Sequence, residues 1–392
     1  MIRSRFRNLR HGTLAIYQGG DRSVYGQECE GGVAADIHVH DSRFWDVLVR
    51  RGNLGAGESF AEGLWSSSDV AAVVRLMVRN ESIMQGMDRG LAILSKPLLS
   101  AYHLLRRNTE AGSRSNISAH YDLSNDFFAL FLDPTMTYSC GYFETPGSTM
   151  EQASISKMER ACRKLELKAS DHLLEIGTGW GSMAIYAARN FGCKVTTTTI
   201  SKEQHALAVQ RVEEAGLSDR ITVLLEDYRK LTGEYDKLIS IEMIEAIGHQ
   251  YFDEYFATCA RLLKPEGLMC LQSITIADPF YEAAKRSVDF IKRYIFPGCC
   301  IPSVGALSQS IARSSDLKLV HLEDIGPHYA RTLSIWNANL KCNGERALQL
   351  GFNEEFLRLW EFYFAYCEGG FAERRLGDVQ MVLARPLARP QV

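Results

Sequence analysis

The sequence has no uninterrupted apolar stretch that reaches the ~18 residues of a transmembrane helix, and it does not start with the apolar block of a secretory signal. Its ten cysteines form no Cys-x-x-Cys pair and no nearby Cys/His spacing of a zinc site. The net charge of −3 at pH 7 is too small for the broad electrostatic field that nucleic acids select. We therefore expect a cytoplasmic protein with reduced cysteines, no metal site and no nucleic-acid partner.

The length of 392 residues exceeds the usual size of one hydrophobic core, which predicts two domains. Residues 1–94 mix alternating runs such as 35–40 with helical patterns such as 68–77, as expected of a small α+β domain. Residues 95–116 carry four basic side chains against one acid and are predicted to form a basic linker. The N-terminal part has more Lys and Arg than acidic residues, which favours a surface that faces a membrane.

From Ser148 onward, predicted helices alternate with predicted strands, as in a doubly wound α/β sheet. Ser201 is a plausible N-cap for the helix after the second strand, and Gly216 ends that helix. Residues 278–371 form a long, mainly helical insertion rich in aromatic side chains, and insertions of that length usually carry substrate. Ligands of such sheets bind beyond the carboxyl ends of the strands. The predicted strands are 172–176, 194–200, 221–225, 237–241, 268–273 and 378–383.

A glycine-dense turn, residues 177–181, follows the first of these strands with the spacing Gly-x-Gly-x-Gly. Glycine lets the backbone turn tightly and leaves amides exposed at the start of the next helix, where a nucleotide-like ligand can pack. The spacing differs from the dinucleotide pattern, and no Gly-Lys-Ser/Thr follows to hold a triphosphate. The turn therefore indicates S-adenosylmethionine rather than NAD or ATP, with a purely structural turn as the alternative.

The turns after the other strands supply polar groups around the same crevice. The side chains of Thr199, Ser201 and Gln204 can hydrogen-bond a ribose, although helix capping explains Ser201 equally well. Tyr228 can stack near adenine. The candidate cofactor-binding residues of the strand ends are Glu175, Gly177, Gly179, Gly181, Thr199, Ile200, Ser201, Gln204, Asp227 and Tyr228.

Several separate motifs occur in order along the chain, at residues 120–128, 136–143, 173–181, 240–248, 294–298, 328–333 and 366–371. With them the chain resembles the cyclopropane-fatty-acyl-phospholipid synthases, a family that also contains mycolic-acid cyclopropane synthases and lipid C-methyltransferases. The resemblance implies a Rossmann-like catalytic methyltransferase domain over residues 117–392, with a lipid-binding helical insertion. An extra N-terminal domain suits the phospholipid-modifying branch of that family.

The reaction implied by the resemblance uses S-adenosylmethionine to methylate a cis double bond in an acyl chain of a phospholipid. Loss of a proton from the new methyl group then closes a cyclopropane ring, with bound bicarbonate as the base. Because an alkene is a poor nucleophile, catalysis would rest on alignment in a dry pocket. We expect a homodimeric enzyme that is peripherally associated with the inner membrane and acts on unsaturated phospholipid acyl chains in place.

The bicarbonate site implied by the resemblance consists of Cys140, Glu245 and Tyr329, with the backbone amide of Ile274 as a further donor. Tyr329 can donate its phenol proton, and Glu245 could share a proton with the anion. An acid at the start of a helix is the alternative interpretation of Glu245. Cys367 matches a further family cysteine, and we expect it to pack near the pocket because alkene methylation needs no thiolate nucleophile.

Tyr121, Tyr138 and Ser139 match cofactor-side residues of the family, although simple core packing also explains the two tyrosines. The helix-like stretch 281–296 would form an apolar wall for an acyl chain, with an ordinary core as the alternative. Basic residues on its other face would meet phosphate headgroups or simply be solvated. These basic residues are Lys285, Arg286, Lys292 and Arg293.

Three other functions stay open on the sequence alone. A lipid C-methyltransferase would leave a methyl or methylene branch instead of a ring, and Gln272, where many family members have His, favours it. A methyltransferase for a soluble acceptor such as a small amine has the same fold. A non-catalytic lipid-binding protein is the alternative outside the enzymes, and failure to bind S-adenosylmethionine would favour it.

Gln272 cannot titrate, but its amide can still hold an anion. We therefore expect Gln272→His to leave turnover largely intact, because the geometry of the site survives while a proton relay through this position is not used. Steady-state kinetics of the variant check this expectation, and a loss of ~100-fold would contradict it.

Overall fold

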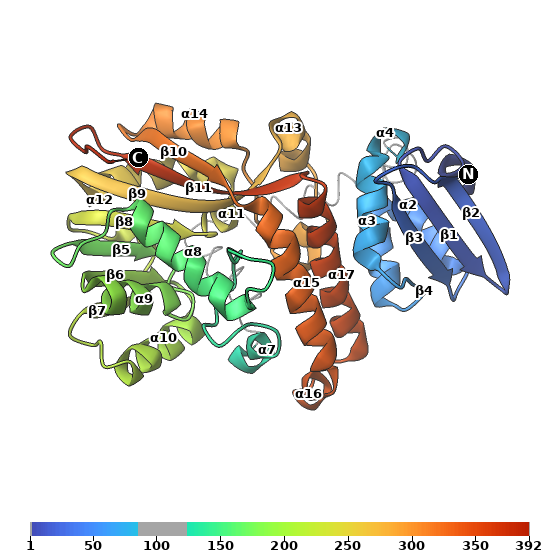
Figure 1. Cartoon of the computed structure of the whole chain (residues 1–392), viewed down its shortest axis with the longest axis horizontal. Coiled ribbons are helices and arrows are strands. Elements are labelled where there is room, and N and C mark those ends of the chain that lie inside the picture. Colours follow the sequence, from blue (N-terminus) through green and yellow to red (C-terminus); the bar gives the residue numbers. More distant parts are fainter. Residues whose placement is uncertain (1, 85–123, 392) are drawn as a thin grey trace. The chain divides into compact units, whose positions relative to one another are not determined.

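The computed structural model describes residues 2–84 and 124–391 (Figure 1). The predicted basic linker and Tyr121 lie outside the described residues. Contacts divide the described chain into two compact units, each built from separate stretches of sequence. The first unit contains residues 2–84, 286–297 and 333–376, and the second contains residues 124–285, 298–332 and 377–391.

The N-terminal part of the first unit is a four-stranded sheet with helices, as predicted for a small α+β fold (Figure 1). The strands lie in the order β2-β1-β3-β4, with β1 antiparallel to β2 and parallel to β3. Alternate residues of β3 are buried, which gives the sheet one core face. The elements are α1 (Ile2–Phe6), β1 (Gly12–Gln18), β2 (Asp21–Gln27), β3 (Val33–Val39), α2 (Arg43–Ala61), β4 (Trp65–Ser66), α3 (Val70–Arg79) and α4 (Glu81–Met84).

Helices from the C-terminal part of the sequence complete the first unit. They are the second half of α15 (Gly326–Cys342), α16 (Gly344–Gln349) and α17 (Glu354–Ala372). Helix α17 packs on α2 and α3. The carboxylate of Glu373 binds Arg75 at 2.8 Å and Arg79 at 2.6 Å, and Phe362 contacts the rings of Phe60 and Trp65. Residues almost three hundred positions apart therefore share one hydrophobic core.

The second unit is built on a seven-stranded sheet in the order β10-β11-β9-β8-β5-β6-β7. Strands β9, β8, β5, β6 and β7 are parallel, and β10 is antiparallel to β11. The strands are β5 (His172–Ile176), β6 (Lys194–Thr199), β7 (Ile221–Leu225), β8 (Tyr235–Ile241), β9 (Leu263–Ile276), β10 (Lys318–Asp324) and β11 (Leu376–Ala384). The doubly wound architecture predicted from the alternation of helices and strands is confirmed.

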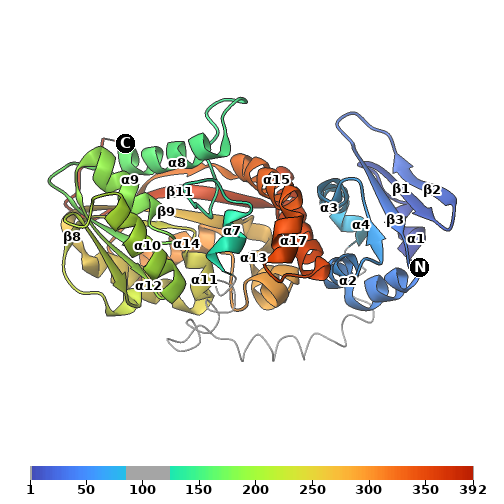
Figure 2. The same ribbon diagram turned by 90° about the horizontal axis from the view of Figure 1, so that it is seen from below.

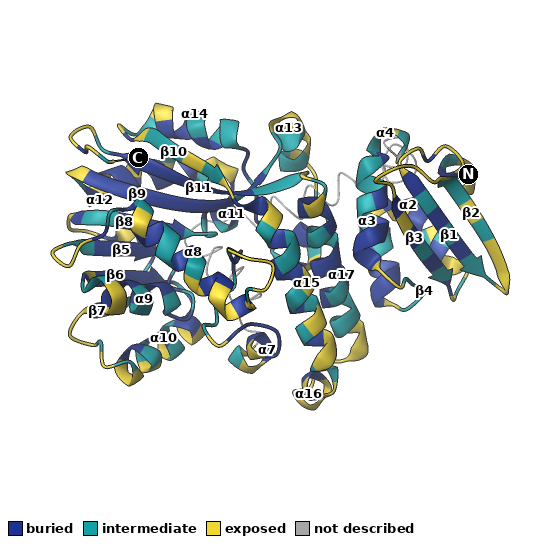
Figure 3. Ribbon diagram, viewed as in Figure 1, coloured by how far each residue is buried: buried dark blue, intermediate teal, exposed yellow. Residues whose placement is uncertain are grey.

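Two hydrophobic cores cover the two faces of this sheet, because neighbouring residues of a strand point to opposite sides. Leu173 lies in the core with α8, α9 and α10, whereas Leu174 lies in the core with α12 and α14. Figures 1 and 2 show these helices around the sheet, and Figure 3 shows its strands largely buried. The helices are α7 (Asn125–Ala129), α8 (Met150–Lys164), α9 (Ser182–Phe191), α10 (Lys202–Glu214), α11 (Ile244–Ile247), α12 (Phe252–Leu262) and α14 (Val304–Ser314).

The predicted insertion differs from the structure in two places. It contains the strand β10, which the sequence pattern did not predict and which pairs along β11. The expected continuous helix 281–296 is interrupted, since α13 (Asp278–Arg286) ends before a separate π-helix, η4 (Ile291–Ile295). Lys292 is buried and its Nζ donates to the Ser287 carbonyl at 2.9 Å, so the proposed basic outer face does not include it.

None of the helices in the described ranges 2–84 and 124–391 is long and apolar enough to span a bilayer.

The contact between α17 and α3 depends on a residue without a side chain. A Cβ on Gly369 would lie 2.6 Å from Val74 Cγ1 and 2.8 Å from Val74 Cβ. We expect Gly369→Ala to destabilise the first unit by about 1–3 kcal/mol, because overpacking outweighs the better helix propensity of alanine. Hydrogen exchange of α3 amides and the thermal-unfolding midpoint measure the effect. Gly344→Ala is the matched control, since no atom lies within 4 Å of its added Cβ, and an equal response of both variants would contradict the prediction.

Candidate active site

The glycine turn after β5 has the backbone geometry that its sequence predicts. Gly177, Gly179 and Gly181 have φ values of 102°, 52° and 86°, a region that favours glycine. Gly181 is the N-cap of α9, and the amides of Gly177 and Thr178 donate to the Thr198 carbonyl of β6. Among the residues that the structure describes, no atom lies within 4 Å of a Cβ built on Gly179.

Two buried groups support this turn from below. Thr178 Oγ1 and Thr197 Oγ1 lie 2.7 Å apart, and Thr197 Oγ1 donates to Glu175 Oε2 at 2.6 Å. Burial raises the pKa of Glu175 to about 8, although the Thr197 hydrogen bond and Lys157 act in the opposite direction. Glu175 is therefore a mostly protonated, buried carboxyl at neutral pH, directly before the turn.

The polar residues after β6 bind one another. Thr199 Oγ1 donates to Gln204 Oε1 at 2.9 Å and accepts from the Ser201 amide at 3.1 Å. Ser201 is the N-cap of α10 and accepts from the Gln204 amide, as capping predicts. Ile200 between them is half-buried. This local network explains the positions of these side chains without a ligand.

Asp227 and Tyr228 follow β7 and begin a short 3-10 helix, η2 (Tyr228–Lys230). Burial would raise the pKa of Asp227, but its hydrogen bonds with Arg229 outweigh that effect and lower the pKa. Tyr228 packs edge-on against Tyr255 in one hydrophobic core of the sheet, and its buried hydroxyl has no hydrogen-bond partner within residues 2–84 and 124–391. Core packing thus accounts for the Tyr228 ring in the structure.

Tyr138 and Ser139, in the segment before α8, have different surroundings from each other. The Tyr138 ring meets Phe128 and Phe131 edge-on or nearly so, with ring centroids 5.3 Å and 5.9 Å away. Ser139 is buried and accepts a hydrogen bond from Lys157 Nζ at 2.6 Å. Ser139 therefore links this segment to α8, while Tyr138 belongs to an aromatic cluster.

The carboxylate of Glu242, just after β8, collects donors from three distant segments. The Cys140 amide donates to Oε1 at 2.9 Å, Gln272 Nε2 donates to Oε1 at 2.8 Å, and the Tyr329 hydroxyl donates to Oε2 at 2.6 Å. Three donors aimed at two oxygens form the pattern expected of an ionised carboxylate. The sequence predicted a role for all three donors but none for Glu242, their common acceptor.

The backbone of Glu242 is also unusual. Its φ is 49°, in the left-handed region that residues with a Cβ rarely adopt. Its amide donates to the Gln272 carbonyl of the neighbouring strand at 2.8 Å, which fixes this conformation. A Cβ on Gly177 would lie 3.3 Å from Met243 Cβ, so the glycine turn and the residue next to Glu242 are in contact distance.

Glu245 lies one turn further along, in the first turn of α11, and is 8% exposed. Its Oε1 accepts from the Ser273 hydroxyl at 2.9 Å and from the Ile274 amide at 2.5 Å. Burial, followed by the negative charge of Glu242, raises the pKa of Glu245 to about 8. The Ile274 amide, which the resemblance assigns to a bound anion, donates to the Glu245 carboxyl itself.

Strand β11 brings a third acid into the cluster. Gln272 Nε2 also donates to Asp378 Oδ2 at 2.9 Å, and burial, with the nearby Glu242, raises the pKa of Asp378 well above its usual range. Burial lowers the pKa of Lys157, while Glu242 acts to raise it. Burial also raises the pKa of the Cys140 thiol, so Cys140 serves the site through its amide rather than as a thiolate.

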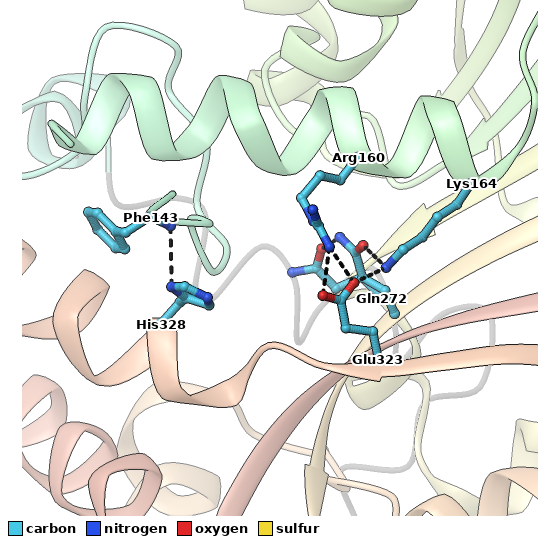
Figure 4. A network of polar contacts seen from close by, with 7 residues as sticks. Phe143, Arg160, Lys164, Gln272, Glu323 and His328 are labelled. Atoms are coloured by element: carbon cyan, nitrogen blue, oxygen red, sulfur yellow. Dashed lines mark hydrogen bonds and ion pairs between the residues drawn. The ribbon is translucent and has the colours of Figure 1, made fainter. Parts of the chain in front are cut away.

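A chain of hydrogen bonds extends from Gln272 to the edge of the sheet (Figure 4). Gln380 Nε2 donates to Gln272 Oε1 at 3.0 Å, and Lys164 Nζ donates to Gln380 Oε1 at 2.6 Å. Lys164 and Arg160 of α8 both bind Glu323 of β10, at 2.5 Å and 2.6 Å. Burial would raise the pKa of Glu323, but these two cations lower it to about 2. The unpredicted strand β10 therefore helps to orient Gln272.

Cys367 belongs to a different unit from these residues, and its expected packing near the pocket stays a prediction. It lies on α17 in the first unit, and burial raises the pKa of its thiol. All the donors around Glu242 belong to the second unit.

The bicarbonate implied by the resemblance does not fit the residues present. The Cys140 amide and the Tyr329 hydroxyl donate to Glu242, and the Ile274 amide donates to Glu245. The donors proposed for an external anion are thus bound to carboxylates of the chain itself.

Residues 108–381 match the family described as mycolic acid cyclopropane synthetase. The chain is 38% identical to the tuberculostearic acid methyltransferase of Mycobacterium tuberculosis over 352 residues, which cover 87% of this chain and 82% of that protein. It is 34% identical to the cyclopropane-fatty-acyl-phospholipid synthase of Escherichia coli over 361 residues, 91% of this chain and 89% of that protein.

Solved structures give the same result. A cyclopropane synthase from Mycobacterium tuberculosis aligns with a TM-score of 0.65 and 32% identity, covering 69% of this chain and 98% of that chain. A mycolic acid cyclopropane synthase complexed with SAH and CTAB aligns with the same TM-score and 33% identity, and with the same coverage of both chains. These likenesses confirm the predicted methyltransferase fold and support S-adenosylmethionine as the cofactor.

Glu245 gives the site a pH dependence whose sign can be worked out. Its folded-state pKa of about 8 lies above the ordinary value of 4.5, so folding takes up a proton between these values. Stability therefore falls as pH rises from about 4.5 to about 8. Gln cannot titrate, so we expect Glu245→Gln to gain stability relative to the native chain between about pH 5.5 and about pH 8, by on the order of 1 kcal/mol or more.

Thermal-unfolding midpoints of both proteins at the two pH values check this expectation. Glu266→Gln, at an exposed position of β9, is the control and should show the same difference at both values. A Glu245→Gln difference that did not change with pH would contradict the assignment.

Proposed function

The chain belongs to the mycolic acid cyclopropane synthetase family, and on that premise we propose that it methylates a cis double bond of a phospholipid acyl chain. Membership makes the chain an S-adenosylmethionine-dependent methyltransferase of a family that modifies lipids. The proposed step transfers the methyl group to one alkene carbon, and a proton is then lost from the resulting cation. The net change is the addition of one CH2 unit to the acyl chain.

The observation that carries this proposal is the position of the Glu242 carboxylate beside the glycine turn. Gly177 of the turn lies next to Met243, the residue that follows Glu242. The Cys140 amide and the Tyr329 hydroxyl donate to the Glu242 carboxylate. A methyl donor at the turn and a negative group next to it suit a reaction that passes through a cation. The Cys140 thiol of this site is buried with a raised pKa, which is consistent with chemistry that needs no nucleophilic side chain.

A cyclopropane ring is the product that we propose first, because ring closure needs only loss of a proton from the transferred methyl group. A methylene or methyl branch is the second candidate. Gln272, at a position where the family resemblance implies His in many members, and the 38% identity to a tuberculostearic acid methyltransferase favour it. Both the ring and the methylene branch add the same CH2 unit.

We also propose that the enzyme works as a homodimer associated with the membrane surface, where its substrate lies. The surplus of Lys and Arg in the N-terminal part supports a contact with anionic lipid. We propose membrane contact for residues 1–94 and catalysis for residues 117–392, of which residues 286–297 and 333–376 fold into the first unit.

The test uses the purified full chain, S-adenosylmethionine and vesicles of phospholipids with cis-unsaturated acyl chains. We expect mass spectrometry of the released acyl chains to show a gain of one CH2 unit, and NMR to distinguish ring protons from the vinyl protons of a methylene branch. Vesicles of saturated phospholipid are the control, because they lack the alkene.

No mass gain in unsaturated vesicles would contradict the proposal. Methylation of a soluble amine without vesicles would favour a small-molecule methyltransferase. Absence of S-adenosylmethionine binding by calorimetry would favour a lipid-binding protein instead.

A further inference from the structure

We propose that the Glu242 carboxylate is the built-in base of this enzyme and replaces the external bicarbonate ion in proton removal. This inference rests on the proposed methylation of an acyl double bond. It assigns to a side chain of the protein the step that the family resemblance assigns to a bound anion.

The first support is the set of donors. The Cys140 amide and the Tyr329 hydroxyl, which the sequence analysis assigned to an external anion, instead bind the two oxygens of Glu242 at 2.9 Å and 2.6 Å. Gln272 Nε2 adds a third hydrogen bond at 2.8 Å. An anion-binding arrangement of three donors is therefore already filled by a carboxylate from the chain.

The second support comes from comparing the acids of the cluster. Glu245 is 8% exposed and its Oε1 is occupied by Ser273 and Ile274, while its raised pKa of about 8 keeps it mostly protonated near neutral pH. Asp378 is fully buried in the strand and its pKa is raised well above its usual range. Glu242 is only half-buried, so it is the acid of this cluster that a substrate can reach.

The third support is the backbone of the residue. The φ of 49° at Glu242 lies where glycine is favoured, and a glycine there would leave the donors free for a separate anion. Left-handed backbone at a residue with a long side chain persists only when the surroundings hold it. Here the amide of Glu242 is fixed by the Gln272 carbonyl at 2.8 Å.

The chemistry balances without another reactant. The C–S bond of the sulfonium breaks with its electron pair on sulfur, which becomes a neutral thioether, and the alkene π pair forms the new C–C bond. Glu242 takes a proton from the new methyl group, and the C–H pair closes the ring. For a methylene branch, a hydride shift precedes this step and the same pair forms the exocyclic double bond. In both routes the nearby carbocation makes the C–H bonds of the transferred methyl group acidic enough for a well hydrogen-bonded carboxylate to accept a proton.

The test compares the full-length enzyme with Glu242→Gln and Glu242→Gly on unsaturated phospholipid vesicles, in carbon dioxide-depleted buffer with and without added bicarbonate. We expect the native enzyme to turn over equally well in both buffers. Glu242→Gln should lose roughly 100-fold or more in kcat, the usual contribution of a general base, while its calorimetric affinity for S-adenosylmethionine stays unchanged.

Glycine readily adopts the positive φ of this position, and Glu242→Gly removes the carboxylate that occupies the three donors. Part of the lost activity should therefore return with bicarbonate, but not with chloride at equal ionic strength. Glu266→Gln, exposed on β9, is the control and should behave as the native enzyme in both buffers.

Loss of native turnover on removal of bicarbonate, with recovery on its return, would overturn the inference and leave the proposed function standing. Native kcat in Glu242→Gln would also overturn it. A native enzyme that adds no CH2 unit in either buffer would overturn the proposed function and this inference together. The comparison of the native enzyme in the two buffers does not depend on the folding of any variant.

Discussion

The arrangement of the second unit depends on one half-buried carboxylate that is shared by three distant donors. Glu242 joins the segment before α8, the strand β9 and the helix α15 through Cys140, Gln272 and Tyr329. Each donor would be costly to leave unpaired in this partly buried place. The interaction that holds these segments in register is therefore the same one that presents a negative group beside the glycine turn.

A cluster of acids this dense is possible because the protein does not ionise all of them. Burial raises the pKa of Glu245 to about 8 and that of Asp378 well above its usual range. Neutral carboxyl groups remove most of the repulsion that ionised ones would exert on Glu242. The cationic pair Arg160 and Lys164, which keeps Glu323 ionised, lies at the far end of the same hydrogen-bonded chain.

Local patterns in the sequence were enough for much of the fold. Spacing of glycines fixed the positive φ values at Gly177 to Gly181, and the Ser201 cap and the parallel strands followed from short-range rules. Strand β10 was not predicted, because it has no regular alternation of buried and exposed residues and forms only by pairing with β11. The interruption between α13 and η4 was also not predicted from the sequence. Contacts with residues distant in sequence place the aromatic side chains around it.

In the candidate site, too, the sequence predicted some residues, whereas contacts between distant segments decided the others. A resemblance between motifs identified the donors Cys140 and Tyr329, but it could not show what they bind, because their acceptor is set by the folded positions of three segments. Two acids three residues apart after a buried strand were the only local sign of Glu242.

The packing of α17 on α2 and α3 has a consequence for how the chain is made. The N-terminal sheet is synthesised before α17, yet α2 and α3 can pack against α17 only after residue 372 has been synthesised. Until then the apolar faces of α2 and α3 are exposed, and the seven-stranded sheet, whose last strand is β11, is likewise incomplete. Neither unit can finish folding before α17 and β11 have been synthesised, so until then a nascent chain of this protein depends on protection from aggregation.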